Sequence, residues 1–510
     1  MKFLTSLSIR IFIISWSIFA IHFATNIVRE HYPAFSLVDY ATFKVDEYQG
    51  FHPDIFVHTD GHSYIGNNVA ASVIAAIPLF IFDPILDVLE RYEKRKIRRE
   101  GVPGTIYRTR HTNSIKFLKL VKEKGLSLRF GGASVVTSVF LMAPLSAMTI
   151  VFMFHLLTRR GIRTKQALWL SMLFGFGTPV FFRTGVINHN MLIMYAAFVA
   201  FYLLWIQPEM RFPVSMNRRL TAGFLCGACL ALDYSGIIPL LVFYGYLIIN
   251  RLSTASLKTA IRESIPFIIG CAPPVLFLCY SQWSMFGNPF LPGQYWMPNV
   301  TTTEGYYFRN PYSDSGFRGF TWPSLDLFYL NLFSPSYGMY TYGPILAIGL
   351  IPTCFYKKNK LILTQPERIL TTIFFILFLS FCAANQYSRI QFNSGFRYLV
   401  PLIPLIYLSA CDHLVRIPRR WLIIIVIPIL LHSWVISMVR EPVPESWCRV
   451  ITEGLQLPWL SVLRATAPEG HPILGSSLLP TTIILLTMLL VFTIWKLGKT
   501  SALKRETDNR

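Results

Sequence analysis

Residues 29–68 read REHYPAFSLVDYATFKVDEYQGFHPDIFVHTDGHSYIGNN. This stretch concentrates carboxylates and histidines in a chain that is 53% hydrophobic and only 14% charged. It directly follows one long apolar run, residues 9–28, and many further apolar runs come after it. We therefore expect membrane-embedded helices that present this polar segment to a substrate, and we expect the segment itself to carry the chemistry of the protein.

The apolar runs define the fold class. They are about 16–25 residues long, which is the length that an α-helix needs to cross a bilayer. The sequence predicts an all-α, polytopic membrane protein of about 12 transmembrane helices. The formal charge of +21 does not indicate a nucleic-acid partner, because Lys and Arg lie between apolar runs, where they orient membrane helices. The eight cysteines lie mostly inside apolar runs and imply neither a disulfide framework nor a zinc site.

The positions of the positive charges give the expected orientation. Lys2 and Arg10 flank the first run, which we interpret as an uncleaved anchor with a cytoplasmic N-terminus. Counting back from the basic C-terminal tail puts most basic loops inside only if residues 220–249 cross twice, with a break at Asp233. Residues 69–89 then lie on the membrane as an amphipathic helix. In the alternative topology these residues cross, and several basic loops become external.

This topology divides the chain into four parts. They are an anchor (1–28), an external loop with juxtamembrane helices (29–130), a transmembrane core that includes an external loop at 284–340 (131–412), and C-terminal helices with an external loop at 440–478 and a basic cytoplasmic tail (413–510). We expect a bacterial inner (plasma) membrane protein with both termini in the cytoplasm. Membrane lipids are then its surroundings, and the polar residues gather on the external face.

Six stretches carry a resemblance to a known family. They are SLVDYATFKVDEY (36–48), GHSYIGNNVAASVIAAIPLF (61–80), FGFGTPVFFRTGVINHN (174–190), WSMFGNPFLPGQY (283–295), LFSPSYGMYTYGPIL (332–346) and FNSGFRYLVPLIPL (392–405). In order and spacing they resemble GT-C-type membrane glycosyltransferases, and most of all the lipid-carrier-dependent enzymes related to protein mannosyltransferases and aminoarabinose transferases. The resemblance implies a polyprenyl-phosphate-linked sugar as donor and a lipid, glycan or protein as acceptor.

Two positions depart from the family pattern. Relatives often have a lysine with Pro-Gly or Pro-Pro at the turn where this chain has Asn67 and Asn68. The acidic pair near the first span, usually Asp-Glu in relatives, is Arg29-Glu30 here. These departures leave altered donor recognition and loss of activity both open.

Glycosyl transfer needs a carboxylate that takes the proton of the acceptor. The opening stretch offers three candidates for this general base: Glu30, Asp46 and Asp39. Glu30 directly follows the first apolar run, where the resemblance places an acid. Asp46 stands in a doublet with Glu47, and repulsion between like charges raises the pKa of one member of such a pair. The structural alternative for each is helix capping or pairing with a neighbouring cation.

Six further positions are expected to bind substrate: Asn67, Asn68, His189, Asp233, Arg389 and Arg397. His189 lies at an outer helix start, where the resemblance implies a functional polar residue. Asp233 interrupts an apolar run, and a carboxylate near a membrane is costly without a partner. Arginine offers a bidentate fork to phosphate, so Arg397 suits the carrier phosphate. The structural alternatives are a hydrogen-bonded core histidine, a helix cap and an arginine that snorkels to the interface.

A divalent metal ion is also considered as a cofactor. His52 and Asp54 are of the residue types that bind such ions, although their spacing matches no closed site. Solvent exposure is the alternative explanation for these polar residues.

Two other functions compete with the glycosyltransferase. One is a lipid or glycolipid transporter or flippase, which would place ionisable residues near the bilayer midplane and often on repeated halves. The other is a non-catalytic membrane subunit on the same scaffold. Clustering of the polar residues at one face favours the enzyme.

Overall fold

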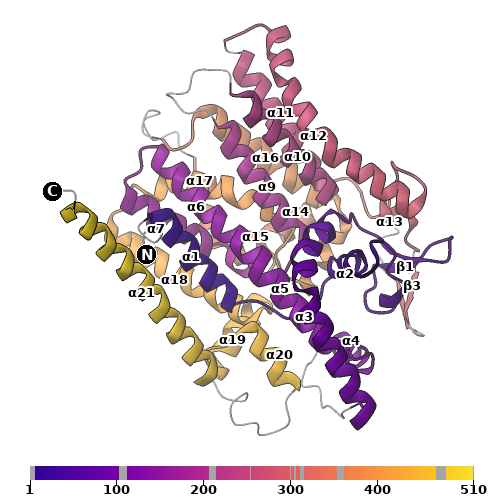
Figure 1. The fold of residues 1–510 in the computed structure, drawn as a ribbon. Coiled ribbons are helices and arrows are strands. Elements are labelled where there is room, and N and C mark those ends of the chain that lie inside the picture. Colours follow the sequence, from indigo (N-terminus) through magenta and orange to yellow (C-terminus); the bar gives the residue numbers. More distant parts are fainter. Residues whose placement is uncertain are drawn as a thin grey trace.

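Helices dominate the computed structural model (Figure 1). It describes residues 6–102, 112–205, 214–252, 254–298, 300–303, 306–309, 315–352, 361–466 and 478–508. Among these residues, seven helices are long and apolar enough to cross a membrane: Ala70–Glu100, Ser127–Arg159, Tyr234–Leu252, Leu257–Phe286, Gln365–Ala384, Arg419–Val439 and Leu478–Lys496. The predicted helical, multi-pass organisation is confirmed at this level.

The N-terminal part contains the polar stretch. Its elements are α1 (Leu7–Ile21), α2 (His31–Tyr40), the 3-10 turn η2 (Asp46–Tyr48), β1 (Ile55–Val57), β2 (Ser63–Ile65), α3 (Ala70–Glu100) and α4 (Thr112–Glu123). β1 and β2 pair antiparallel, with Phe56 opposite Tyr64. Figure 1 shows α2, α4 and β1 gathered on one side of the helical bundle. The polar stretch therefore folds as a unit that packs on the end of the bundle.

The central helices build the core behind this unit. They are α5 (Ser127–Thr137), the π-turn η3 (Ser138–Met142), α6 (Ala143–Arg159), α7 (Thr164–Phe176), α8 (Val180–Thr184), α9 (His189–Leu204), α10 (Met216–Leu232), the 3-10 turn η4 (Tyr234–Gly236), α11 (Ile237–Leu252) and α12 (Leu257–Phe286). α9 is buried along most of its length, from His189 to Leu204. Its first residue consequently lies at a protein-enclosed position.

The C-terminal half begins with α13 (Gly293–Trp296) and the hairpin β3 (Val300–Thr303) and β4 (Tyr306–Arg309). It continues with α14 (Leu325–Phe333), α15 (Met339–Tyr342), η5 (Pro344–Leu350), α16 (Gln365–Ala384), η7 (Gln386–Asn393), η8 (Val400–Leu402), α17 (Ile403–Leu414), α18 (Arg419–Val439), α19 (Val443–Glu453), α20 (Pro458–Thr466) and α21 (Leu478–Asp508). α17 is buried throughout and completes the core beside α9.

The predicted break inside residues 220–249 is confirmed. α10 ends at Leu232, and the backbone N–H of Ser235 donates to the Asp233 carboxylate at 2.9 Å. Gly236 follows in a space that no side chain fits, because a Cβ there would lie 2.0 Å from the carbonyl oxygen of Cys229. α11 then begins at Ile237. Asp233 and Gly236 thus separate the end of α10 from the start of α11.

One of the apolar runs, residues 342–355, does not form in its described part the membrane-spanning helix that its hydrophobicity predicts. α15 ends at Tyr342, and after Gly343 the chain forms only the short 3-10 helix η5. Gly349 packs on the backbone of Ile406, where a Cβ would lie 2.2 Å from the carbonyl oxygen. Residues 353–360 lie outside the described part. Close contact with α17 therefore replaces a long helix here.

The helix expected over residues 69–89 is longer than predicted, because α3 continues through the basic segment to Glu100. Its two ends have clear neighbours. Asn68, just before α3, donates to the carbonyl of Leu230 at 3.4 Å, near the end of α10. Glu93, near the other end, accepts from the N–H of Leu128 at 2.7 Å, at the start of α5. α3 thus runs antiparallel to α5 and contacts both α2 and α5.

Candidate functional site

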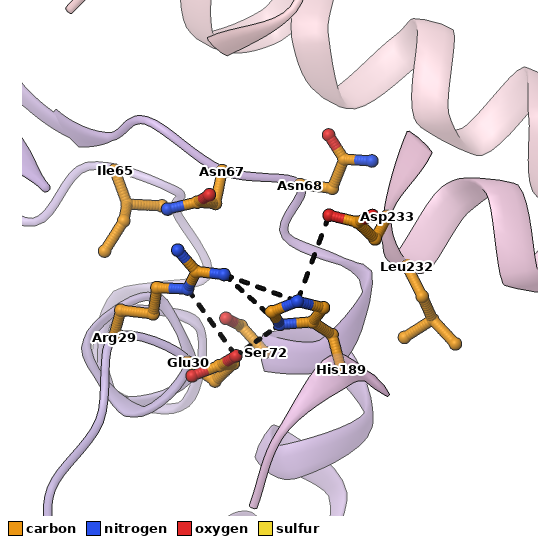
Figure 2. A pocket seen from close by; sticks show the side chains of 9 residues that line it. All are labelled: Arg29, Glu30, Ile65, Asn67, Asn68, Ser72, His189, Leu232 and Asp233. Atoms are coloured by element: carbon orange, nitrogen blue, oxygen red, sulfur yellow. Dashed lines mark hydrogen bonds and ion pairs between the residues drawn. The ribbon is translucent and has the colours of Figure 1, made fainter. Parts of the chain in front are cut away.

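One pocket gathers five of the predicted site residues: Glu30, Asn67, Asn68, His189 and Asp233 (Figure 2). It is narrow, with room for about one water molecule in this conformation. Five segments contribute: the turn before α2, the end of the hairpin, the start of α3, the start of α9 and the end of α10. The lining residues are Arg29, Glu30, Ile65, Asn67, Asn68, Ser72, His189, Leu232 and Asp233.

Glu30 and His189 form the centre of this pocket. Both are almost completely buried, and His189 Nδ1 lies 2.8 Å from Glu30 Oε1. Asn190 Nδ2 lies 3.1 Å from the other ring nitrogen. The two contacts fit a neutral imidazole whose Nδ1–H donates to Glu30 and whose Nε2 accepts from Asn190. Asn188 fixes this position, because its side chain caps α9 by accepting from the N–H of Met191 at 2.9 Å.

A second carboxylate approaches the same imidazole from the opposite direction. Asp233 Oδ2 lies 3.9 Å from His189 Nε2. A dashed line in Figure 2 marks this contact. The break between α10 and α11 is what brings this carboxylate to the start of α9. His189 therefore lies between two acids that are far apart in sequence.

Arg29 supplies the positive charge of the pocket. Its guanidinium donates to Asp54 Oδ2 at 3.1 Å, and its Nε lies 3.7 Å from Glu30 Oε1. It also lies 3.3 Å from the ring of His189. Asn67 Nδ2 donates to the same Asp54 oxygen at 3.0 Å. These contacts hold the β2–α3 turn against the start of α2.

The surroundings keep Glu30 ionised. Burial raises the pKa of Glu30, but the hydrogen bond from His189 and the charge of Arg29 lower it more, so that the pKa lies below its usual range. The pKa of Asp54 is lowered for similar reasons. Burial raises its pKa, while the nearby His52 and Arg29 lower it further, and the net shift is downward.

The other two candidate bases lie elsewhere. Asp46 accepts from the N–H of Ser63 at 2.5 Å and pairs with His62 at 2.9 Å, so that it joins η2 to the hairpin. Asp39 lies 2.6 Å from the guanidinium of Arg129. Neither lines the pocket. Of the three predicted bases, only Glu30 lies with the predicted binding residues.

The two predicted phosphate-binding arginines have different surroundings. Arg389 forms an ion pair with Asp326 at 2.6 Å. Arg397 instead lies over the ring of Tyr398, 4.8 Å from its centroid, and donates to the Tyr398 hydroxyl at 3.3 Å. Its buried Nε has no hydrogen-bond partner in the structure.

Arg397 belongs to a group of three arginines with Arg183 and Arg440. Arg183 donates to the carbonyl of Ser394 at 3.0 Å, next to the Arg397 loop, and Arg440 lies over the ring of Phe182. Burial and the charges of the other two arginines lower the pKa of Arg183 to about 9, although Glu30 raises it. Burial lowers the pKa of Arg440 to about 10. Within the described ranges, none of the three forms an ion pair with a carboxylate.

The metal candidates do not form a closed site. His52 Nδ1 lies 3.9 Å from Asp54, whose carboxylate is already bound by Arg29 and Asn67. Burial lowers the pKa of His52, against the charge of Asp54. In the part of the chain that the structure describes, no three His, Cys, Asp or Glu side chains are placed to hold a metal ion.

Sequence reasoning did not assign a role to Arg29 or Arg440. Arg29 adjoins Glu30, and a cation next to a buried acid was an available signal. Arg440 follows directly on an apolar run and adopts the left-handed conformation, with φ of 62°, as the C-cap of α18. Nothing in the sequence relates this helix end to Arg183.

No protein-family model matches this chain, and no curated protein or solved structure is significantly similar to it. Its class therefore rests on its own features. The seven long apolar helices indicate a membrane-embedded, multi-pass helical protein. A buried acid–histidine pocket lies among its helix ends.

Proposed function

We propose that the protein is a membrane glycosyltransferase that moves a sugar from a polyprenyl-phosphate-linked donor to an acceptor at the external face of the membrane. The observation that carries this proposal is the buried Glu30–His189 pair together with three arginines that, in the described part of the chain, form no ion pair with a carboxylate. Such transfer needs a base for the acceptor and positive charge for the leaving phosphate. The chain offers Glu30 as the base and the three arginines as the positive charge. The two groups interact electrostatically, since the charge of Glu30 raises the pKa of Arg183.

Glu30 is the proposed base. The hydroxyl oxygen of the acceptor forms a bond with the anomeric carbon, and its proton passes to the Glu30 carboxylate. The bond between the anomeric carbon and the phosphate oxygen breaks, and the electron pair leaves with the polyprenyl phosphate. His189 holds the carboxylate in place and Arg29 keeps it ionised. Direct attack of the acceptor oxygen in a single displacement inverts the configuration at the anomeric carbon.

Arg183, Arg397 and Arg440 are the proposed phosphate-binding group. A buried cation such as Arg183 is costly without a counter-ion, and a phosphate would offset both the burial and the repulsion by Arg440 and Arg397 that lower its pKa. Guanidinium groups also match phosphate oxygens in geometry. The leaving group gains negative charge in the transition state, so the same arginines would accelerate the reaction.

The proposed topology keeps α3 on the external side without crossing. α3 is itself long and apolar enough to cross a membrane, so crossing by α3 is the alternative topology. The termini are proposed to be cytoplasmic, in a bacterial plasma membrane. A reporter fused at Gly161 that is accessible from outside would contradict this orientation.

A direct assay tests the proposed function. Purified protein is incubated with synthetic polyprenyl-phosphate sugars and a total envelope-lipid extract, and release of free polyprenyl phosphate is followed by mass spectrometry. Sugar-dependent release supports the enzyme. Movement of labelled donor across a vesicle bilayer without release would instead indicate a transporter. Neither release nor movement would indicate a non-catalytic subunit.

The arginine group gives a separable prediction. Replacing Arg183 and Arg397 by glutamine is expected to weaken binding of polyprenyl phosphate by roughly 10- to 100-fold, because each removes a charge-assisted hydrogen bond to phosphate. Binding is measured by competition with a fluorescent polyprenyl phosphate in detergent. The matched control is Arg389→Gln, whose arginine is already neutralised by Asp326. Equal loss of affinity in the control would contradict the assignment of the phosphate to Arg183 and Arg397.

A further inference from the structure

The proton that Glu30 takes from the acceptor must leave again before the next turnover. Only 7% of the Glu30 side chain is exposed, so solvent does not reach the carboxyl group freely. In this conformation the pocket has room for about one water molecule and none for a sugar ring. The conformation therefore suits the interval between two turnovers, in which Glu30 has to release its proton.

The groups that line the pocket restrict where this proton can go. Among the described lining residues, the side chains that ionise are Arg29, Glu30, His189 and Asp233. Arginine keeps its protons in proteins and has no acceptor atom. Nδ1 of His189 already donates to Glu30 at 2.8 Å, and its Nε2 accepts from Asn190 at 3.1 Å. The carboxylate of Asp233 is thus the acceptor that remains.

Asp233 is held with one oxygen available for this proton. Its Oδ1 accepts from the backbone N–H of Ser235 at 2.9 Å and caps the turn η4. Its Oδ2 points to the imidazole of His189, 3.9 Å from Nε2 (Figure 2). This distance is too long for a direct hydrogen bond and suits a bridging water molecule. The two acids therefore lie on opposite sides of one imidazole ring, at a pocket of the size of a water molecule.

The two acids differ in their access to solvent. The Asp233 side chain is 29% exposed, compared with 7% for Glu30. Burial raises the pKa of Glu30, but the hydrogen bond from His189 and the charge of Arg29 lower it below its usual range. Protonated Glu30 consequently gives up its proton readily. The direction from the enclosed acid to the solvent-exposed acid is the direction in which a proton must leave.

We propose that Asp233 is the proton exit of the pocket, an inference that rests on the proposed glycosyltransferase function. A water molecule between the two acids takes the proton from Glu30 and gives one of its own protons to Asp233 Oδ2. The O–H bond formed at Asp233 breaks again when the proton passes to solvent. Both acids end as carboxylates and the water molecule is regenerated, while His189 stays a neutral imidazole. This role differs from the substrate binding that the sequence predicts for Asp233.

Single-turnover and steady-state rates test the proton exit. In Asp233→Asn the amide oxygen can still accept from Ser235, because Asn caps helices as well as Asp does, but it cannot take a proton. We expect the first turnover, measured with enzyme in excess of donor, to keep the wild-type rate, since Glu30 starts ionised. The steady-state rate should fall by about 100-fold, the lower end of what a positioned proton-transfer group contributes. Added formate or imidazole, which are small enough to carry the proton, should restore it.

Asp60→Asn is the matched control. Asp60 is exposed outside the pocket and also accepts the backbone N–H two residues on, that of His62, at 3.0 Å. This variant should leave both rates unchanged. An unchanged steady-state rate in Asp233→Asn would overturn the proton exit. So would a slow first turnover, or a slow steady state that the added buffers do not restore, because either result would give Asp233 a role in binding or folding. Absence of transfer by the wild-type protein would instead contradict the proposed function itself.

Discussion

Replacing Glu30 by glutamine is expected to lower the rate of sugar transfer by about 100- to 10,000-fold, the range attributed to a general base. Glutamine keeps the shape of the side chain and its contact with His189, but it cannot take a proton from the acceptor. Affinity for polyprenyl phosphate should change little, because the phosphate is assigned to other residues. The measurement is the initial rate of carrier-phosphate release, with donor affinity determined in parallel.

The controls for this prediction come from the other two candidate acids. Asp46→Asn is expected to retain most of the activity, because Asp46 bonds to Ser63 and His62 outside the pocket. Asp39→Asn tests the third position, although it also removes a partner of Arg129. A variant of Asp46 that loses activity while Glu30→Gln remains active would transfer the role of base to Asp46.

His189 explains why the choice between these acids needed the structure. Glu30 and His189 are separated by 159 residues and meet because α2 and α9 begin at the same end of the bundle. The sequence places Glu30 directly after the first apolar run and His189 at a helix start, but helix periodicity holds no information on which helices adjoin. The pair itself is therefore a tertiary feature, like the approach of Asp233 to the same ring.

Local signals were more informative for the chain breaks. Asp233 with Gly236 interrupts an apolar run, and the structure ends one helix and begins another there. At Gly343 and Pro344 the same kind of signal was present within an apolar run and was outweighed by hydrophobicity. The expected helix failed because a run of apolar residues reports burial or lipid contact and does not by itself report helix length.

Arg129 is the position at which sequence reasoning was least informative. It ends the basic segment 91–129, a composition typical of a solvated surface, yet only 6% of the residue is exposed. Its guanidinium contacts four carboxylates, Asp39, Asp83, Asp87 and Glu90, at 2.6, 3.4, 2.8 and 2.8 Å. These acids lie on α2 and α3, so one side chain joins both helices to α5. In sequence they appear as scattered charges on an amphipathic helix.

Replacing Arg129 by glutamine is expected to destabilise the protein by roughly 3 kcal/mol at neutral pH, the lower end of the range for breaking a buried ion pair. We use the lower end of this range because the Asp87 side chain is partly exposed, so that solvent screens its charge. Loss of the arginine leaves four carboxylates facing one another, with Lys94 as a cation on Glu90. The measurement is the midpoint of thermal unfolding in detergent. Arg91→Gln, which changes an exposed arginine on α3, is the matched control and should leave the midpoint nearly unchanged.

The pH dependence of this variant distinguishes charge from packing. Burial already raises the pKa of Asp39 in the native protein, and Arg129 opposes that rise. Without Arg129 the folded-state pKa rises further above the unfolded value, so the ionised form destabilises the folded state above that pKa. Stability must then recover as the pH falls through the raised pKa, because the folded protein binds the proton more tightly.

We expect the difference in midpoint between variant and wild type to be largest near pH 8 and to shrink towards pH 5. A difference that stays constant over this interval would mean that Arg129 stabilises the helices by packing on Phe35, whose ring centroid lies 5.7 Å from its guanidinium carbon, and not by its charge.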